Sequence, residues 1–260
     1  MGVIRVREML RDPIYGQYVR RAFDRSAREP NSLVDVLANA EEIDGACDVR
    51  PKTRVDDFSC TLILYGESMN PANVVDDGAP AFTAKTTLAS GVTEWSIPAH
   101  GGDAWTLFVA RDAWVFAHAG ASERTRASLA ESASPPPRLD LEPGALVAVA
   151  LRASALDARD FDRESLNGTE RVIVNALDTG EMLVTPSAKG DVVSRFWLTD
   201  EDSAKILEGE MLATTKPDAR CDSTCKLVRA IAASVLHVDR SGTFVSVRLH
   251  LPESVLKRLL

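Results

Sequence analysis

The cysteines are the residues of this chain whose chemistry is easiest to assess, because they form two pairs that are each close in the sequence. Cys47 lies near Cys60, and Cys221 lies near Cys225. An even number of cysteines in close pairs favours two short-loop disulfides. Two alternatives stay open: the thiols are free and buried, or all four bind one zinc ion. Zinc is disfavoured because structural sites usually pair cysteines about two to four residues apart, whereas twelve residues separate Cys47 from Cys60.

Two disulfides predict a protein that works outside the reducing cytosol, in the periplasm or at the cell surface. The opening residues contain no secretory hydrophobic segment. Instead, the chain starts almost directly on the strand-like residues Val3–Val6. This start is typical of a mature domain, so we expect a leader or lipid anchor that is absent from the given sequence.

Histidines are the next candidates for chemistry. A His-Gly-Gly-Asp loop runs from His100 to Asp103, and its glycines could hold both polar side chains near a ligand or simply make a turn. His118 follows Trp114 and Phe116 on one face of a predicted strand, which favours a half-buried, hydrogen-bonded histidine over a general base. The sequence therefore predicts His100, Asp103 and His118 as ligand-binding candidates.

Linear motifs of the common reaction classes are absent. There is no G-x-S-x-G, H-E-x-x-H or G-x-G-x-x-G pattern, and no phosphate-binding P-loop. An S-x-x-K pattern occurs at Ser223–Lys226 and Ser254–Lys257, but without S-D-N or K-T-G partners it indicates a helix start or an exposed turn. The sequence predicts no catalytic residue, no metal site and no cofactor.

The composition is that of an ordinary globular protein that folds alone. The 260 residues are 45% hydrophobic and 26% charged, and no apolar run is long enough for a transmembrane helix. The net charge of −8 repels phosphate backbones, so nucleic acid is excluded as a partner. We expect the partner to be another envelope protein or a small ligand.

The elements that must position these residues follow from hydrophobic periodicity. Asp12 and Pro13 predict the start of one helix, and Ser32 starts a second helix that stops near Gly45. From Ser59 the period changes to that of strands, which form an antiparallel meander. Further elements are predicted as follows: a helix from Ser122 to Ala130, strands at Gly144–Leu151, Val192–Leu198 and Thr243–Leu251, and a hairpin of Arg171–Leu177 with Met182–Pro186.

These elements predict an α+β fold with largely antiparallel sheets and helices packed on one face, and they leave open whether the two halves are similar to each other. The three prolines at 135–137 give a stiff connector. We therefore predict an N-terminal half at 1–133, a connector at 134–143 and a C-terminal half at 144–260.

Two short segments carry a resemblance. The opening Leu10–Tyr18 and the ending Leu249–Lys257 look similar to uncharacterised exported, often lipoprotein-like, α+β proteins of high-GC Gram-negative bacteria. The resemblance covers these two ends and the general layout, and it implies envelope localisation. It brings no catalytic residue to this sequence.

Together these observations favour a non-catalytic envelope protein that acts as a binding or scaffold domain over an enzyme. One alternative is a hydrolase whose site is assembled only in three dimensions, where it would leave no linear motif. Another is a structural subunit of a larger complex.

Overall fold

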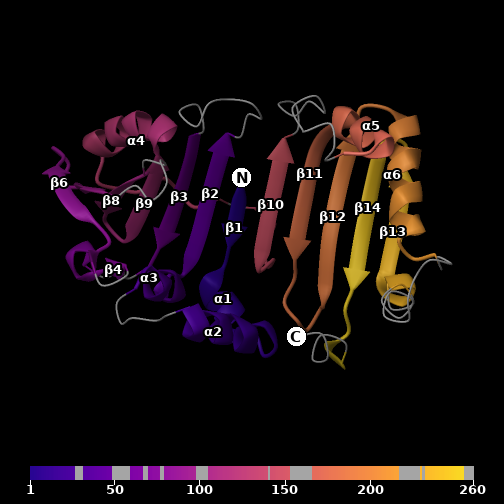
Figure 1. Cartoon of the computed structure of the whole chain (residues 1–260), viewed down its shortest axis with the longest axis horizontal. Helices are drawn as coiled ribbons and strands as arrows, with labels where there is room; N and C mark the ends of the chain where they lie inside the picture. The colour runs from indigo at the N-terminus through magenta and orange to yellow at the C-terminus, as the bar shows by residue number, and fades with distance from the viewer. Residues whose placement is uncertain are drawn as a thin grey trace. The chain divides into compact units, whose positions relative to one another are not determined.

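The computed structural model describes residues 1–26, 32–48, 59–66, 70–76, 79–97, 105–139, 141–152, 166–216, 229 and 232–254 (Figure 1). The chain forms two compact units, unit 1 from Met1 to Leu141 and unit 2 from Glu142 to Leu260. The predicted boundaries at 133/134 and 143/144 stay a prediction.

Unit 1 is built on an antiparallel sheet with the strand order β1-β2-β3-β9-β8-β7-β6. The strands are β1 (Gly2–Ile4), β2 (Glu42–Asp48), β3 (Ser59–Tyr65), β6 (Thr83–Thr87), β7 (Thr93–Ser96), β8 (Trp105–Ala110) and β9 (Ala113–His118), with a separate short pair of β4 (Val75–Asp76) and β5 (Ala79–Pro80). The predicted antiparallel meander is confirmed for β6–β9, whereas β3, its expected first strand, pairs with β9 and not with β6.

Two helices of unit 1, α2 (Tyr15–Ser26) and α3 (Leu33–Asn39), begin where a side chain accepts free backbone N–H groups. The carboxylate of Asp12 accepts the N–H groups of Ile14 and Tyr15, and Ser32 forms a capping box with Asp35. The helices are α1 (Val6–Arg11), α2 (Tyr15–Ser26), α3 (Leu33–Asn39), the 3-10 turn η2 (Pro71–Asn73) and α4 (Ala119–Glu131). The helix expected to reach Gly45 is shorter than predicted, because Glu42–Asp48 pairs as β2.

Helices pack on both faces of the unit 1 sheet, so the expectation of one covered face is wrong for this unit. Ala121 and Leu129 of α4 pack in one core with Phe108 and Val115. The opposite face carries a second core, made by Val6, Val36, Ala40, Leu64, Val74, Ala81, Phe82, Leu107 and Trp114. The reason lies in β9, where nearly every side chain is buried whichever face of the sheet it points to, so both faces must be covered.

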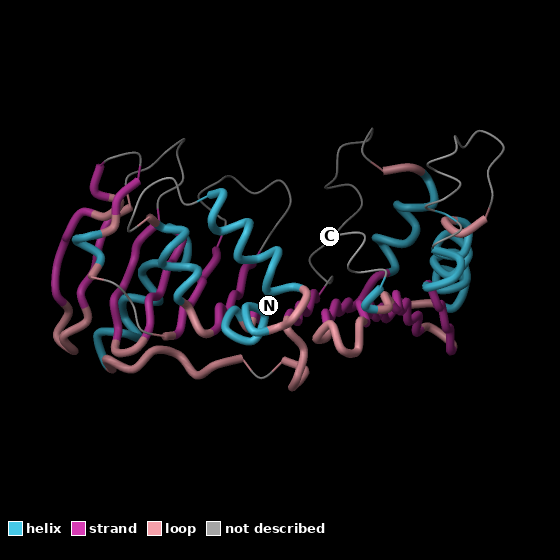
Figure 2. Tube along the Cα trace, turned by 90° about the horizontal axis from the view of Figure 1, so that it is seen from below, coloured by secondary structure: helices cyan, strands magenta, loops and turns pink. Residues whose placement is uncertain are grey.

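Unit 2 contains an antiparallel sheet with the strand order β13-β14-β12-β11-β10. Its elements are β10 (Val147–Arg152), α5 (Gly168–Ala176), β11 (Leu177–Val184), β12 (Asp191–Leu198), α6 (Glu201–Ala213), β13 (Leu236–Ser241) and β14 (Phe244–His250). Ala204 and Leu207 of α6 pack against Leu198 and Val245 of the sheet. Figure 2 shows both helices on one side of these strands.

One predicted hairpin is wrong. The segment expected as the strand Arg171–Leu177 is largely the helix α5, and the residues between the two expected strands, 178–181, lie inside β11 and form no turn. Asn167 and Glu170 form a capping box that starts α5, and this local signal overrides the strand preference of its valines and isoleucine. The α+β class, with antiparallel sheets in both units, is confirmed.

Within the described residues, no helix is both long enough and apolar enough to cross a membrane.

Candidate functional site

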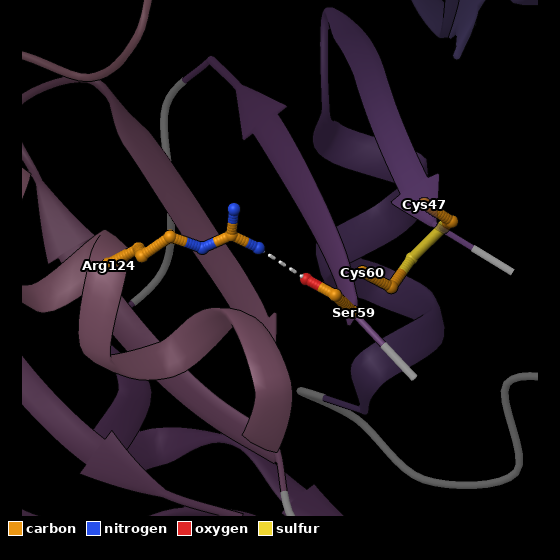
Figure 3. Close-up of a disulfide and its surroundings, with 4 residues drawn as sticks. All are labelled: Cys47, Ser59, Cys60 and Arg124. Carbon is orange, nitrogen blue, oxygen red and sulfur yellow. Dashed lines mark hydrogen bonds between the residues drawn. A yellow bond between two sulfur atoms is a disulfide. The ribbon is translucent and has the colours of Figure 1, made fainter. Parts of the chain in front are cut away.

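A disulfide marks one end of the candidate site. In the register of β2 and β3, Cys47 lies directly opposite Cys60, and the two sulfur atoms are bonded (Figure 3). This confirms the first predicted pair, and a disulfide leaves neither sulfur as a thiolate for zinc. Cys221 and Cys225 lie outside the described residues, so their pairing stays a prediction.

Beside the disulfide lies an open groove of about 490 Å³ between α4 and the strands β2 and β3. Ala121 and Leu129 turn one side of α4 into the core, which leaves the polar side of the helix along the groove. The lining residues are Ala46, Cys47, Ser59, Thr61, Ala121, Arg124, Thr125, Ser128, Leu129 and Pro136. The floor is thus apolar, while four hydroxyl groups and one guanidinium surround it.

Arg124 is the charged group of this groove. It is exposed, and its Nη2 donates a hydrogen bond to the Ser59 Oγ at 2.9 Å (Figure 3). Among the residues that the structure describes, no carboxylate forms an ion pair with it. A guanidinium has five N–H donors, so several remain to bind a carboxylate or phosphate oxygen.

A second arginine of the same helix has the opposite role. Arg126 donates to both carboxylate oxygens of Glu94 on β7, at 2.9 and 2.6 Å, and Glu94 is 1% exposed. This bidentate bond raises the pKa of Arg126 further above its already high value. Arg126 therefore anchors α4 to the sheet, whereas Arg124 is available to a ligand.

The segment after α4 is bound along the sheet and supplies one wall of the groove. The Tyr65 hydroxyl donates to the carbonyl of Pro136 at 2.8 Å, and the N–H of Leu139 donates to the Asp44 Oδ2 at 2.6 Å. The Arg138 guanidinium lies 4.9 Å from the centre of the Tyr65 ring and bonds Glu41 at 2.8 Å. These contacts hold the proline-rich segment against the strands β2 and β3 of unit 1.

Burial shifts the pKa values of the acidic groups beside this segment. It raises the pKa of Glu42 and of Asp44, and the negative charge of Asp44 raises the pKa of Glu42 further. Burial together with the Asp44 charge raises the pKa of Tyr65 to about 12. Since these groups hold a segment in place, a structural role explains the shifts.

The histidine predicted from the sequence lies elsewhere. His118 is 2% exposed, so it is fully buried rather than half-buried, and its ring packs edge-on against Trp105 at 5.3 Å. It shares a strand face with Trp114 of the second core, opposite the face that α4 covers. His100 and Asp103 lie outside the described residues, so their predicted role is untested.

Sequence reasoning missed Arg124 and the hydroxyl groups around it. The sequence predicted a helix from Ser122 to Ala130, but not what the polar side of that helix faces. That depends on the pairing of β3 with β9, which brings Ser59 beside α4 from far away in the sequence.

No group of three or more histidine, cysteine or acidic residues is arranged to hold a metal ion in the described part of the chain.

No family model matches the chain, and no curated protein matches it either. Among solved structures it is similar to one titled "Structure of crystal form I of TP0453", with a TM-score of 0.47 and 10% sequence identity over 99% of this chain and 89% of that chain. At this level the similarity carries no argument about function.

Proposed function

We propose that this protein is a non-catalytic binding protein that works outside the reducing cytosol, and that the groove along α4 binds a small ligand with an anionic group. The observation that carries this proposal is Arg124, an exposed guanidinium without a described carboxylate partner in a groove with four hydroxyls. A carboxylate would accept two parallel hydrogen bonds from it, and the apolar floor would contact the rest of the ligand.

Binding is favoured over catalysis by the groups that line this groove. A serine or threonine hydroxyl is a weak nucleophile unless a nearby base activates it. The described lining contains no histidine and no carboxylate. Ser59, Thr61, Thr125 and Ser128 are therefore suited to hydrogen bonding rather than to attack on a substrate.

The proposed compartment is the cell envelope or the cell surface. A disulfide such as Cys47–Cys60 persists in oxidising surroundings and is rare in the cytosol. The resemblance of Leu10–Tyr18 and Leu249–Lys257 to exported proteins supports the same location. We therefore also propose that the chain belongs to that lipoprotein-like group.

The test is an NMR titration of the full chain with N-acetyl-trialanine, whose free carboxylate is compared with the neutral C-terminal amide of the same peptide. We expect saturable shifts of backbone amide signals in α4 with the acid and none with the amide. Arg124→Met removes the guanidinium and should abolish the shifts, whereas Arg124→Lys keeps the charge and should retain part of them.

Arg111→Met is the matched control, because Arg111 is an exposed arginine in the turn between β8 and β9, outside the groove. It should bind like the unaltered protein. Equal binding of acid and amide, or full binding by Arg124→Met, would refute the proposed anion site. Inorganic phosphate in a parallel titration distinguishes a general anion site from one that needs the apolar floor.

A further inference from the structure

Strand β13 forms one edge of the unit 2 sheet, and its pairing with β14 is regular along its whole length. All six residues pair with β14 in an unbroken register from Leu236 to Ser241. Within the described part of the chain, no segment other than β14 hydrogen-bonds to the backbone of β13. Such an edge is a template for another strand.

The turn that joins β13 to β14 fixes which backbone groups point outward. Ser241 pairs with Phe244, so Gly242 and Thr243 form a two-residue turn, and Gly242 has the φ of +58° that a type II′ turn needs at its first position. The residues that flank such a turn exchange hydrogen bonds with each other, and the pattern alternates along the strand. The N–H and C=O groups of alternate residues from position 240 backward, at 240, 238 and 236, therefore point away from β14.

The edge strand of unit 1 shows how this chain blunts an edge elsewhere. The pairing of β6 with β7 is interrupted by a register shift between Ala84 and Thr86, where the extra residue is Lys85. A bulge is a common device against strand addition. Strand β13 contains no bulge, and its Arg240 is paired with Glu208 of α6 at 2.7 Å.

We propose that a second copy of this chain adds its β13 antiparallel to this edge, with a two-fold axis at Val238. A two-fold axis perpendicular to the sheet keeps equivalent faces of the two copies on the same side. Residues directly opposite each other share a face, so the axis must lie midway between one residue and the same residue of the second copy. At Val238 it places Val238 opposite its own copy. The same register places His237 opposite Asp239 of the second copy, and the reverse pair follows by symmetry.

Charge and backbone pairing both favour this register. His237 and Asp239 are exposed, and neither has a hydrogen bond or ion pair among the described residues. Within the hairpin His237 lies opposite Arg248, a like charge when the histidine is protonated, and Asp239 of the second copy would offset it. An axis at Asp239 would instead place two carboxylates face to face. The outward groups of positions 236, 238 and 240 would all be hydrogen-bonded in the proposed register.

Analytical ultracentrifugation of the full chain tests the proposal. We expect a monomer–dimer equilibrium for the unaltered protein. Val238→Pro removes the outward N–H at the axis without touching the ladder to β14, since proline is tolerated on an edge strand, and it should yield a monomer. Val238→Thr keeps the N–H and the β-branched shape, so it should still dimerise. Circular dichroism melts of both variants check that the fold is retained.

A charge swap tests the register itself. In a buffer acidic enough to protonate His237, Asp239→Lys should weaken the dimer by about tenfold or more, because both symmetric pairs then change from attraction to repulsion. Adding His237→Asp to that variant restores opposite charges in both pairs and should restore the dimer. A monomeric unaltered protein, a dimer that persists in Val238→Pro, or no rescue by the double variant would overturn the proposal.

Discussion

Replacing Arg126 with leucine tests whether α4 is held to the sheet by its ion pair with Glu94. The variant leaves a carboxylate that is 1% exposed without its guanidinium. Losing one partner of a buried pair costs about 3–5 kcal/mol, and because Arg126 is partly exposed and water reaches it, we expect about 2–3 kcal/mol here. The midpoint of thermal unfolding should fall by about 5–10 °C.

The assay is urea unfolding at several pH values, followed by circular dichroism. In Arg126→Leu the pKa of the buried Glu94 should rise above its value in the unfolded chain, so the lost stability returns as the pH falls. Replacing Glu94 by leucine as well should remove both the loss and its pH dependence, since two well-packed apolar residues often match a buried pair.

Arg124→Leu is the matched control on the same helix. Its guanidinium is exposed and bonds one hydroxyl, so its removal should change the free energy of unfolding by less than about 0.5 kcal/mol. Equal losses in the two arginine variants would refute the division of α4 into an anchoring and a ligand-binding arginine. An unchanged stability of Arg126→Leu would refute the anchor.

Two further predictions concern the disulfide and the buried carboxylates. Changing Cys47 and Cys60 together to alanine should lower the free energy of unfolding by about 3 kcal/mol, measured by urea unfolding, and peptide mapping of protein from its own source should find the two joined; a free-thiol pair in that sample would contradict the proposed compartment. The pKa values of Glu42 and Asp44 are raised in the folded state, so their contribution to stability is complete below the unfolded pKa near 4 and is lost as the pH rises through the folded pKa. Thermal melts from pH 4 to 8 should therefore show a flatter profile in a Glu42→Gln, Asp44→Asn variant, and an unchanged profile would contradict burial as the cause.

The parts of the fold that local patterns decide were predictable from the sequence. The meander of β6–β9 and the helix that contains Leu129 follow from periodicity, and Cys47 and Cys60 were paired by their spacing alone. The helix α5 was missed because its valines and isoleucine favour a strand, while one capping box decides the outcome.

The candidate site could not be predicted, because long-range pairing creates it. Arg124 and Ser59 meet only after β3 has paired with β9, and nothing near either residue in the sequence indicates the other. The hydrogen bonds to the proline-rich segment depend in the same way on Tyr65 and Asp44, which lie far before that segment in the chain.

The position of the Cys47–Cys60 bond has a consequence for the order of events during biogenesis. Both cysteines belong to one hairpin, so their thiols meet as soon as β2 and β3 pair, and closing this short loop costs less entropy than closing a long one. No residue after Tyr65 is needed for that encounter. Oxidation can therefore precede the pairing of β9 and the packing of α4, and the crosslinked hairpin then serves as the preformed wall against which the groove is completed.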